Sequence, residues 1–381
     1  MTAGQVLKGM TWSDPRGYDP MVALSAAFEE QNPDVSITWD KRSLQGFEST
    51  PVDQLAADYD LLIIDHPHVG AVARQGCLLA LDEWISDETM TALANETVGK
   101  SFISYAIDGH QWALPVDAAT QVQAHRPDLG NRAATWREIS ELAARGAVIL
   151  PMRPPHSLMC IYTLAGNIGH PCGSYRDRLL PDEILSHVFA ELKAVTDHID
   201  PACFEMDPIA AMDRLAEDDT LRIAPLTYLY KGYSDEGYRS NRLAFSDIPT
   251  LGRFGPVGSA LGGTGLAISS RTSAPELCAR FAAWAAGAEC QSGLYAASNG
   301  QPGNAVAWAS AEVNAPVLNA YHNTRMTHEA AWLRPRHDGY MAFQAEGAEI
   351  VNEALKDKMP VSDVVRALNG SFAASFGEAA Q

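Results

Sequence analysis

The sequence has few cysteines, and none of them stands close to another. Its six cysteines are scattered along 381 residues, and no C-x-x-C motif occurs. This spacing gives no support to a structural zinc site or a thioredoxin-type redox motif. Cys160 in SLMCIY and Cys278 in ELCARF stand in apolar or helical surroundings. We therefore expect buried free thiols, which suit a reducing compartment.

Basic residues are also scarce. Lysine and arginine number 28 against 47 aspartates and glutamates, which gives a formal net charge of -19. A surface with this charge repels the phosphates of nucleic acids, so we expect no nucleic-acid partner. No apolar run is long enough to span a bilayer, so we expect no membrane insertion.

The sequence lacks the short motifs of common catalytic and phosphate-binding sites. Neither G-x-S-x-G nor H-E-x-x-H occurs. Gly262–Gly265 lacks the Lys-Ser/Thr of a P-loop and precedes a predicted strand, so we interpret it as the return of the chain to the first domain. A Ser-His-Asp or paired-carboxylate enzyme stays possible among 11 histidines and 47 acids. No pattern supports one, and we predict no catalytic residue and no cofactor.

The first residues, MTAGQ, carry neither a charged n-region nor an apolar h-region. Two localisations follow as alternatives. The protein is periplasmic if an export signal was removed from this chain, and cytoplasmic otherwise.

What the sequence does contain is a pattern of alternating strands and helices. A length of 381 residues exceeds what one hydrophobic core usually serves, which predicts two domains. The first elements are predicted as strand, helix, strand, helix and strand at Val6–Trp12, Tyr18–Gln31, Val35–Trp39, Val52–Ala57 and Tyr59–Ile64. This order predicts a parallel α/β sheet, in which ligands bind at the carboxyl ends of the strands.

Residues Gln111–Leu129 read as a strand that leaves one domain and enters another. Trp112, Leu114 and Val116 alternate with smaller or polar residues, as in a half-buried strand. Pro115 interrupts the hydrogen-bond ladder, which suits a crossover strand better than a central one.

The order of these segments resembles the bacterial extracellular solute-binding proteins of ABC importers, in their sugar-binding branch. In that family a G-x-x-Y/W-x-x-P strand precedes N/R-x-D-L and T-W-x-E, and here QWALP precedes RPDL and TWRE. Thr135 and Glu138 of the last motif also form a capping-box pattern, which predicts a helix start. Gly262–Asn304 is similar to the family's returning segment, which runs GG-x-G-x-a-I, A-x-x-F-x-x-W/F and G-x-P.

The resemblance implies an α/β fold of the two-lobed periplasmic-binding-protein kind. Each lobe would be a parallel-rich sheet flanked by helices, with the ligand cleft between the lobes. Residues 1–116 with 261–304 would form the N-terminal lobe, and 117–260 with 305–381 the C-terminal lobe.

The resemblance also implies a function. The protein would be a monomer that binds a small polar organic solute, a carbohydrate or a carboxylated small molecule, by hinge closure. It would deliver this solute to the permease subunits of an ABC importer. A cytoplasmic ligand-binding sensor or an enzyme built on the same fold stays open as the alternative.

Candidate ligand-binding residues follow the carboxyl ends of the first strands. Trp12, Asp14, Arg16 and Tyr18 offer aromatic faces, a carboxylate and a guanidinium, which suit a sugar or a carboxylate. The alternative for this segment is a helix-capping turn with Tyr18 in the core.

Asp65-His66-Pro67-His68 is the sharpest local cluster, and it could be a zinc site, a ligand contact or a structural loop. We predict no metal, because a third distant ligand is not evident. Either histidine could donate to an anionic ligand when it is protonated.

The crossover and the second lobe supply the other candidates. Tyr228 and Tyr230 are two residues apart and would share one face of an extended strand. The loop around Trp332 either borders the cleft or lies on the surface with its indole packed. The predicted ligand-binding set is Trp12, Asp14, Arg16, Tyr18, Arg42, Asp65, His66, His68, Asp117, Gln121, Tyr228, Tyr230, Gly263, Trp332 and Arg334.

Overall fold

The computed structural model describes residues 4–377, apart from the side chains at 48 and 49. The chain divides into two compact units, Met1–Ala119 with Gly262–Asn314 and Thr120–Leu261 with Ala315–Gln381. It passes between the units at 119/120, 261/262 and 314/315. The sequence placed the lobe boundaries at 116/117, 260/261 and 304/305. Both units combine strands and helices, which confirms the α/β class.

The first unit is built on a five-stranded sheet with the strand order β2-β1-β3-β10-β6. β1 pairs in parallel with β2 and β3, as the sequence pattern predicted. β10 pairs antiparallel with β3 and β6, so the sheet is mixed. β6 is an edge strand and carries Pro115, a position where a missing N–H leaves no gap inside the sheet. These strands span β1 (Gln5–Trp12), β2 (Val35–Arg42), β3 (Leu61–Ile64), β6 (Leu114–Asp117) and β10 (Thr264–Ile268).

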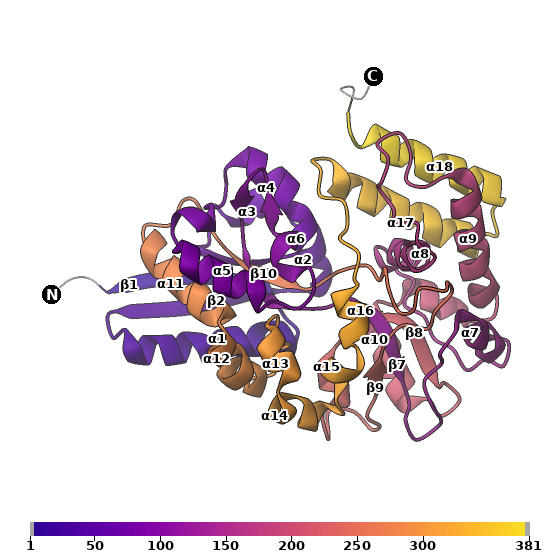
Figure 1. Ribbon diagram of the computed structural model, residues 1–381, viewed down its shortest axis with the longest axis horizontal. Helices are drawn as coiled ribbons and strands as arrows, with labels where there is room; N and C mark the ends of the chain where they lie inside the picture. The colour runs from indigo at the N-terminus through magenta and orange to yellow at the C-terminus, as the bar shows by residue number, and fades with distance from the viewer. Residues whose placement is uncertain (1–3, 378–381) are drawn as a thin grey trace. The chain divides into compact units, whose positions relative to one another are not determined.

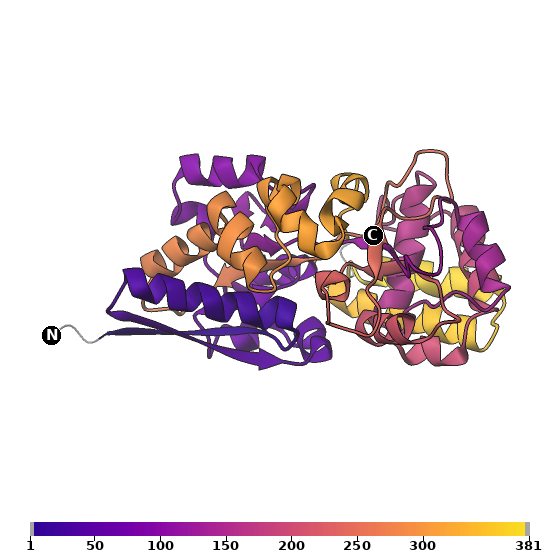
Figure 2. The same cartoon turned by 90° about the horizontal axis from the view of Figure 1, so that it is seen from below.

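Helices cover both faces of this sheet (Figure 1). In β3, Leu61 and Ile63 join the core under α1 (Pro15–Gln31) and α11 (Pro275–Ala286). Leu62 and Ile64 alternate to the other face and join the core under α3 (Val52–Leu55) and α4 (Val69–Gln75). Figure 2 shows α1 lying along β1 and β2. Each fully buried aliphatic side chain contributes about 1.5–3 kcal/mol to stability, which explains the uninterrupted apolar run of β3.

The remaining elements of the first unit are short. They are α2 (Leu44–Ser49), η1 (His66–His68), η2 (Leu81–Glu83), α5 (Asp87–Asn95), α6 (Ser101–Ser104), β4 (Ala106–Ile107), β5 (His110–Gln111), α12 (Ala288–Cys290), the π-helix η5 (Gln291–Tyr295), α13 (Ala305–Ala309) and α14 (Ala311–Asn314).

The second unit contains a three-stranded sheet in the order β8-β7-β9. β7 (Gln121–His125) pairs antiparallel with both β8 (Ile223–Tyr228) and β9 (Ala244–Ser246). The prediction of a parallel-rich sheet is therefore wrong for these three strands. For this unit the prediction came from the family resemblance, because the strand-helix-strand alternation was found only in the first 64 residues. Between β7 and β8 the chain passes through four α-helices, so the rule for a single crossover did not apply.

A helical layer completes the second unit. α8 (His156–Asn167) is buried along its whole length, and it packs against α9 (Asp182–Thr196) and α17 (Tyr340–Lys356). α18 (Val361–Ala374) packs against α9 and α17 (Figure 1). A helix surrounded by other elements is apolar on all sides, which fits the sequence of α8. The other elements are α7 (Trp136–Ala143), η3 (Pro201–Glu205), α10 (Pro208–Glu217), η4 (Lys231–Ser234), η6 (Ala315–Val317), α15 (Ala320–Asn323) and α16 (Arg325–Glu329).

The expectation of free thiols agrees with the structure. All six cysteines are free thiols, and five of them are buried. Among the helices formed by residues 4–377, none has both the length and the apolarity needed to cross a membrane.

Gly263 has a structural reason to be glycine. Its φ is +92°, and a Cβ at this position would lie 2.4 Å from the backbone oxygen of Asp117. We predict that Gly263→Ala lowers the free energy of unfolding by about 1–3 kcal/mol, because both the backbone and the contact become strained. Gly76→Ala is the matched control, since Gly76 has φ +61° and open space around it. Urea unfolding that gave equal losses for the two variants would contradict the contact argument.

Candidate ligand-binding surfaces

In the first unit, most of the predicted site residues gather at one edge of the sheet. β2, β1 and β3 are parallel neighbours, so their carboxyl ends meet at this edge. β6 also ends there, because it is antiparallel to β10, which is itself antiparallel to β3. The carboxyl edge of an open α/β sheet is the usual place for a ligand. It holds Trp12, Asp14, Arg16, Arg42, Asp65, His66, His68 and Asp117.

Arg16 and Asp117 form a buried bidentate ion pair at this edge. Arg16 donates from Nε to Oδ2 of Asp117 at 2.6 Å and from Nη2 to Oδ1 at 2.5 Å. Burial raises the pKa of the Asp117 carboxyl, and the Arg16 guanidinium opposes that shift. The sequence offered Arg16 as a partner for a ligand carboxylate. In the structure two of its donor nitrogens already serve a carboxylate of the protein, and the pair ties α1 to β6.

Trp12 ends β1 and is only 3% exposed. Its ring lies 5.1 Å from the ring of Phe47, and the backbone of Gly17 abuts it so closely that an added Cβ would be 2.4 Å from the indole. Trp12 therefore belongs to the core cluster under α1, and it presents no open face for stacking. Its indole Nε1 is buried and has no hydrogen-bond partner within the described part of the chain.

Asp14 and Tyr18 have local roles at the start of α1. Asp14 caps the helix, and its carboxylate accepts a hydrogen bond from the backbone N–H of Arg16 at 2.9 Å. Burial raises the pKa of Asp14. Tyr18 packs against the same core cluster, with the Lys41 ammonium 4.2 Å from its ring centroid. The segment thus forms the helix-capping turn that the sequence left open as the alternative.

Arg42 ends β2 and is half-buried. Its guanidinium carbon lies 5.6 Å from the ring centroid of Phe47. Burial lowers the pKa of Arg42 to about 10. Its Nε and Nη1 atoms are buried without a hydrogen-bond partner among the described residues. Arg16 donates two hydrogen bonds to Asp117, whereas two buried donors of Arg42 have no acceptor among the described residues.

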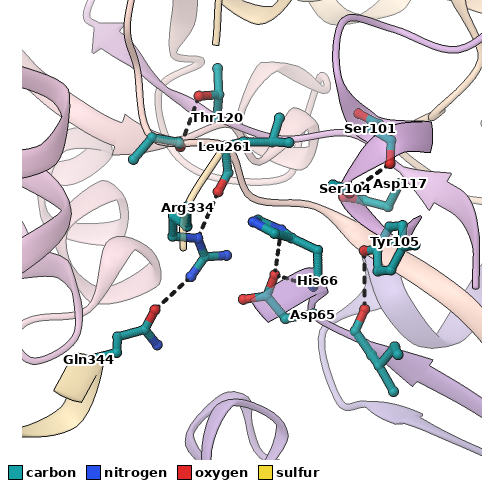
Figure 3. A network of polar contacts seen from close by, with 12 residues as sticks. Asp65, His66, Ser101, Ser104, Tyr105, Asp117, Thr120, Leu261, Arg334 and Gln344 are labelled. Atoms are coloured by element: carbon teal, nitrogen blue, oxygen red, sulfur yellow. Dashed lines mark hydrogen bonds and ion pairs between the residues drawn. The ribbon is translucent and has the colours of Figure 1, made fainter. Parts of the chain in front are cut away.

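Asp65, His66 and His68 form a tight turn after β3. The Asp65 carboxylate accepts a hydrogen bond from the backbone N–H of His66 at 2.8 Å and lies 3.2 Å from Nδ1 of the same residue (Figure 3). His66 is fully buried, and its ring meets the ring of Tyr105 at right angles with the centroids 6.3 Å apart. No group of three His, Cys, Asp or Glu side chains within residues 4–377 is arranged to hold a metal ion.

In the second unit, Gln121 and Tyr228 are cross-strand neighbours on β7 and β8. The Gln121 side chain accepts a hydrogen bond from the Thr163 hydroxyl at 2.5 Å and donates to the Cys160 sulfur at 3.7 Å. Both partners lie on α8, so Gln121 links the sheet to that buried helix. The ring of Tyr228 contacts the ring of His156, with the centroids 6.0 Å apart.

The tyrosines that follow β8 lie in different surroundings. Tyr228 is half-buried, and Tyr230 is 7% exposed. Tyr233 belongs to the interior, because its hydroxyl donates to Asp213 at 2.6 Å and its ring is 1% exposed. Tyr233 was not among the predicted ligand-binding residues.

The loop around Trp332 is held to the second unit by its backbone and its indole. The N–H of Trp332 donates to the carbonyl of Ser259 at 2.7 Å, and its ring lies 5.0 Å from the ring of Tyr162. Arg334 donates to the Leu261 carbonyl at 3.0 Å and to the Gln344 side chain at 2.9 Å (Figure 3). Trp332 stays half-buried, whereas Arg334 is buried.

His156 is a polar residue of this region that the sequence did not single out. It begins α8 and is 4% exposed. Burial lowers its pKa to about 3, and the positive charges of Arg334 and Arg153 add to the effect. Three consecutive residues before it, RPP, look like an ordinary loop in the sequence, and no motif marks the histidine.

Each unit therefore gathers its own set of predicted residues. In the first unit they share the carboxyl edge of the sheet, and Gly263 lies at the start of β10 beside Asp117. In the second unit Gln121, Tyr228 and Trp332 each contact a residue of α8. Arg334 is linked to α8 less directly, through hydrogen bonds that run from Gln344 to Tyr340 and on to Tyr162. The structure provides buried donors, aromatic rings and carboxylates but no arrangement of catalytic groups that we recognise among the described residues.

The sequence profile described as bacterial extracellular solute-binding protein matches residues 23–320 of this chain. No protein with a curated description matches the chain at the level of sequence.

Solved structures with the same fold cover almost the whole chain. A solute-binding protein of an ABC transporter from Agrobacterium vitis, with bound D-mannitol, has a TM-score of 0.78 at 15% identity and covers 99% of each chain. One from Agrobacterium radiobacter, in complex with ribitol, has a TM-score of 0.77 at 17% identity and covers 98% of each chain. The maltose-bound MalE3 of T. maritima has a TM-score of 0.79 at 15% identity, covering 96% of this chain and 98% of its own.

Proposed function

Because this chain belongs to the bacterial extracellular solute-binding proteins, we propose that it binds a small polar organic solute of the carbohydrate or polyol class. The observation that carries the proposal is the family match, which spans more than three quarters of the chain. Structures of the same fold hold mannitol, ribitol and maltose, and they agree in fold over nearly their entire length. The sequence identities between this chain and those proteins are low, between 15% and 17%. They therefore support a class of ligand and do not indicate one particular sugar.

The local chemistry of both units supports this class. Sugar and polyol sites combine aromatic rings with fixed hydrogen-bonding groups. The first unit offers the buried donors of Trp12 and Arg42 at the carboxyl edge of its sheet. The second offers half-buried Tyr228 and Trp332 beside buried Arg334. Hinge closure of the two units on the solute stays a prediction.

The biological role follows from the family. Members of this family are solute-binding proteins, so we propose that the chain delivers its solute to the permease subunits of an ABC importer and carries out no reaction itself. A periplasmic or extracellular location fits this role. Nothing in the described part of the chain favours the alternative, a cytoplasmic sensor or an enzyme of the same fold.

The direct test is isothermal titration calorimetry of the purified protein with a panel of polyols, monosaccharides and maltodextrins. We expect saturable binding of at least one member, with one solute bound per chain. Free amino acids at the same concentrations serve as the control class. Binding confined to amino acids, or none to any carbohydrate, would refute the proposed class.

A further inference from the structure

The carboxyl edge of the first sheet contains three buried N–H donors for which the described residues supply no acceptor. Within the described residues, Nε and Nη1 of Arg42 and Nε1 of Trp12 have no hydrogen-bond partner. All three atoms can only donate, since neither a guanidinium nor an indole nitrogen accepts a hydrogen bond. Buried donors are normally paired, and an unpaired one costs free energy comparable to a lost hydrogen bond.

The two side chains are held in place by the same neighbour. Trp12 and Arg42 are register partners at the ends of β1 and β2. Both contact the ring of Phe47 on α2, the Trp12 ring at 5.1 Å and the Arg42 guanidinium carbon at 5.6 Å from its centroid. A Cβ added at Gly46 would lie in ordinary contact with the aliphatic part of Arg42, 3.7 Å from its Cβ and 3.8 Å from its Cδ. Packing therefore fixes the donors before any solute arrives.

The acid nearest to Arg42 on its own strand, Asp40, makes no hydrogen bond with Nε or Nη1 of Arg42. Asp40 lies two residues earlier on β2 and accepts a hydrogen bond from the Tyr59 hydroxyl at 2.9 Å. Lys41, between them, lies over the ring of Tyr18. Arg16, the other arginine at this edge, is already paired with Asp117. An anion at this edge would therefore find Arg42 as its uncommitted cation.

We propose that Arg42, with the Trp12 indole as a second donor, binds an oxyanion of the solute, either a carboxylate or a phosphate. This inference rests on the proposed function and narrows it: the preferred solutes are sugar acids or sugar phosphates, and not neutral polyols. A neutral hydroxyl could accept one hydrogen bond but would leave the half-buried positive charge uncompensated. A planar guanidinium matches two oxygens of a carboxylate or a phosphate at once.

The first experiment uses small anions as probes and needs no knowledge of the solute. Acetate and phosphate are titrated into the protein, with chloride at matched ionic strength as the control, while the Arg42 Nε–H and Trp12 Nε1–H resonances are followed by NMR. Arg42→Lys and Trp12→Phe assign these resonances. We expect both resonances to shift saturably with acetate or phosphate and not with chloride. Resonances that ignore both anions would overturn the inference.

The second experiment compares solutes that differ only in charge. The pairs are D-gluconate with D-sorbitol, and glucose 6-phosphate with glucose, and they separate a carboxylate from a phosphate. We expect the charged member of at least one pair to bind about tenfold tighter or more, and Arg42→Gln to remove that difference. Arg280→Gln is the matched control, because Arg280 is an exposed arginine of the same unit and the charge change is identical.

The outcomes separate this inference from the proposed function. Neutral members that bind as well as charged ones would refute the inference and leave the proposed function standing. Anion shifts at Arg42 without binding of any sugar, polyol, sugar acid or sugar phosphate would support an oxyanion site at Arg42, but they would refute both the preference for sugar acids or sugar phosphates and the proposed class. Glu48→Gln tests whether Glu48, the acid that follows Phe47 in the sequence, is a partner of Arg42. If anions bind only in that variant, Arg42 has a partner within the protein and the inference is wrong.

Discussion

Asp117→Ala is expected to lower the free energy of unfolding of the first unit by about 3–5 kcal/mol, because it leaves the buried Arg16 guanidinium without its counter-charge. The Asp117 side chain is fully buried and that of Arg16 is 8% exposed, so water cannot replace the carboxylate. Two short hydrogen bonds are lost together with the charge. Urea denaturation followed by hydrogen exchange at amides of β6 would measure the loss in this unit.

Two controls show whether the loss comes from the unpaired charge. The double variant Arg16→Met with Asp117→Leu should recover most of the stability, since apolar side chains replace both charges. Glu141→Ala breaks the ion pair with Arg137, whose side chain is 87% exposed, and should cost less than about 1 kcal/mol. A double variant that is as unstable as Asp117→Ala would show that packing, and not the buried charge, dominates at this position.

The stability of the second unit is expected to fall as the pH falls below about 6.5, the ordinary pKa of histidine, because His156 stays neutral in the folded state. Burial lowers its pKa to about 3. Above about pH 6.5, the pKa of histidine in the unfolded chain, His156 is neutral in both the folded and the unfolded state, so it does not make the free energy of unfolding depend on pH. Between the two pKa values only the unfolded chain takes up the proton, so the free energy of unfolding drops by about 1.4 kcal/mol per pH unit. The full loss approaches about 4–5 kcal/mol.

His156→Gln should weaken the dependence of the free energy of unfolding on pH. The difference between the wild type and the variant isolates the contribution of His156 from that of the carboxylates. His337, whose pKa burial lowers to about 4, contributes in the same direction and remains in the variant. His198→Gln is the control, because His198 is an exposed histidine of the same unit. Hydrogen exchange of α8 amides from pH 7 to pH 4 provides the measurement. Equal slopes for the wild type and His156→Gln would contradict the buried neutral histidine.

Sequence patterns predicted the elements of the first unit well, since each rests on a local signal. The apolar run of β3 requires cover on both faces, and the structure supplies it. A local signal also held in the second unit, where Thr135 caps α7: its hydroxyl accepts from the Glu138 N–H at 3.3 Å. The Glu138 carboxylate accepts from the N–H of Ala134, one residue before the cap, at 2.7 Å. Strand direction in the second unit is set by contacts between distant segments, and no local pattern carries that information.

The roles of the charged residues could not be predicted for the same reason. Arg16 and Asp117 are 101 residues apart, so nothing near either residue shows that they pair. Trp12 looked like a stacking surface because it ends a strand, but the close approach of Gly17 and Phe47 encloses it. Arg42 was one of several arginines near predicted strand ends. What distinguishes Arg42 is that its buried donors have no partner among residues 4–377, and this can be seen only in the folded structure.

Native mass spectrometry of the protein as purified tests the central claim most directly, because a tight solute-binding protein keeps its solute through gentle purification. We predict a mass excess that disappears on denaturation and corresponds to one polyhydroxylated small molecule, neutral or carrying an acid group. Incubation with the matched sugar and sugar-acid panel should restore the excess to stripped protein. A protein that carries no adduct as purified, and gains none from the panel, would contradict the account.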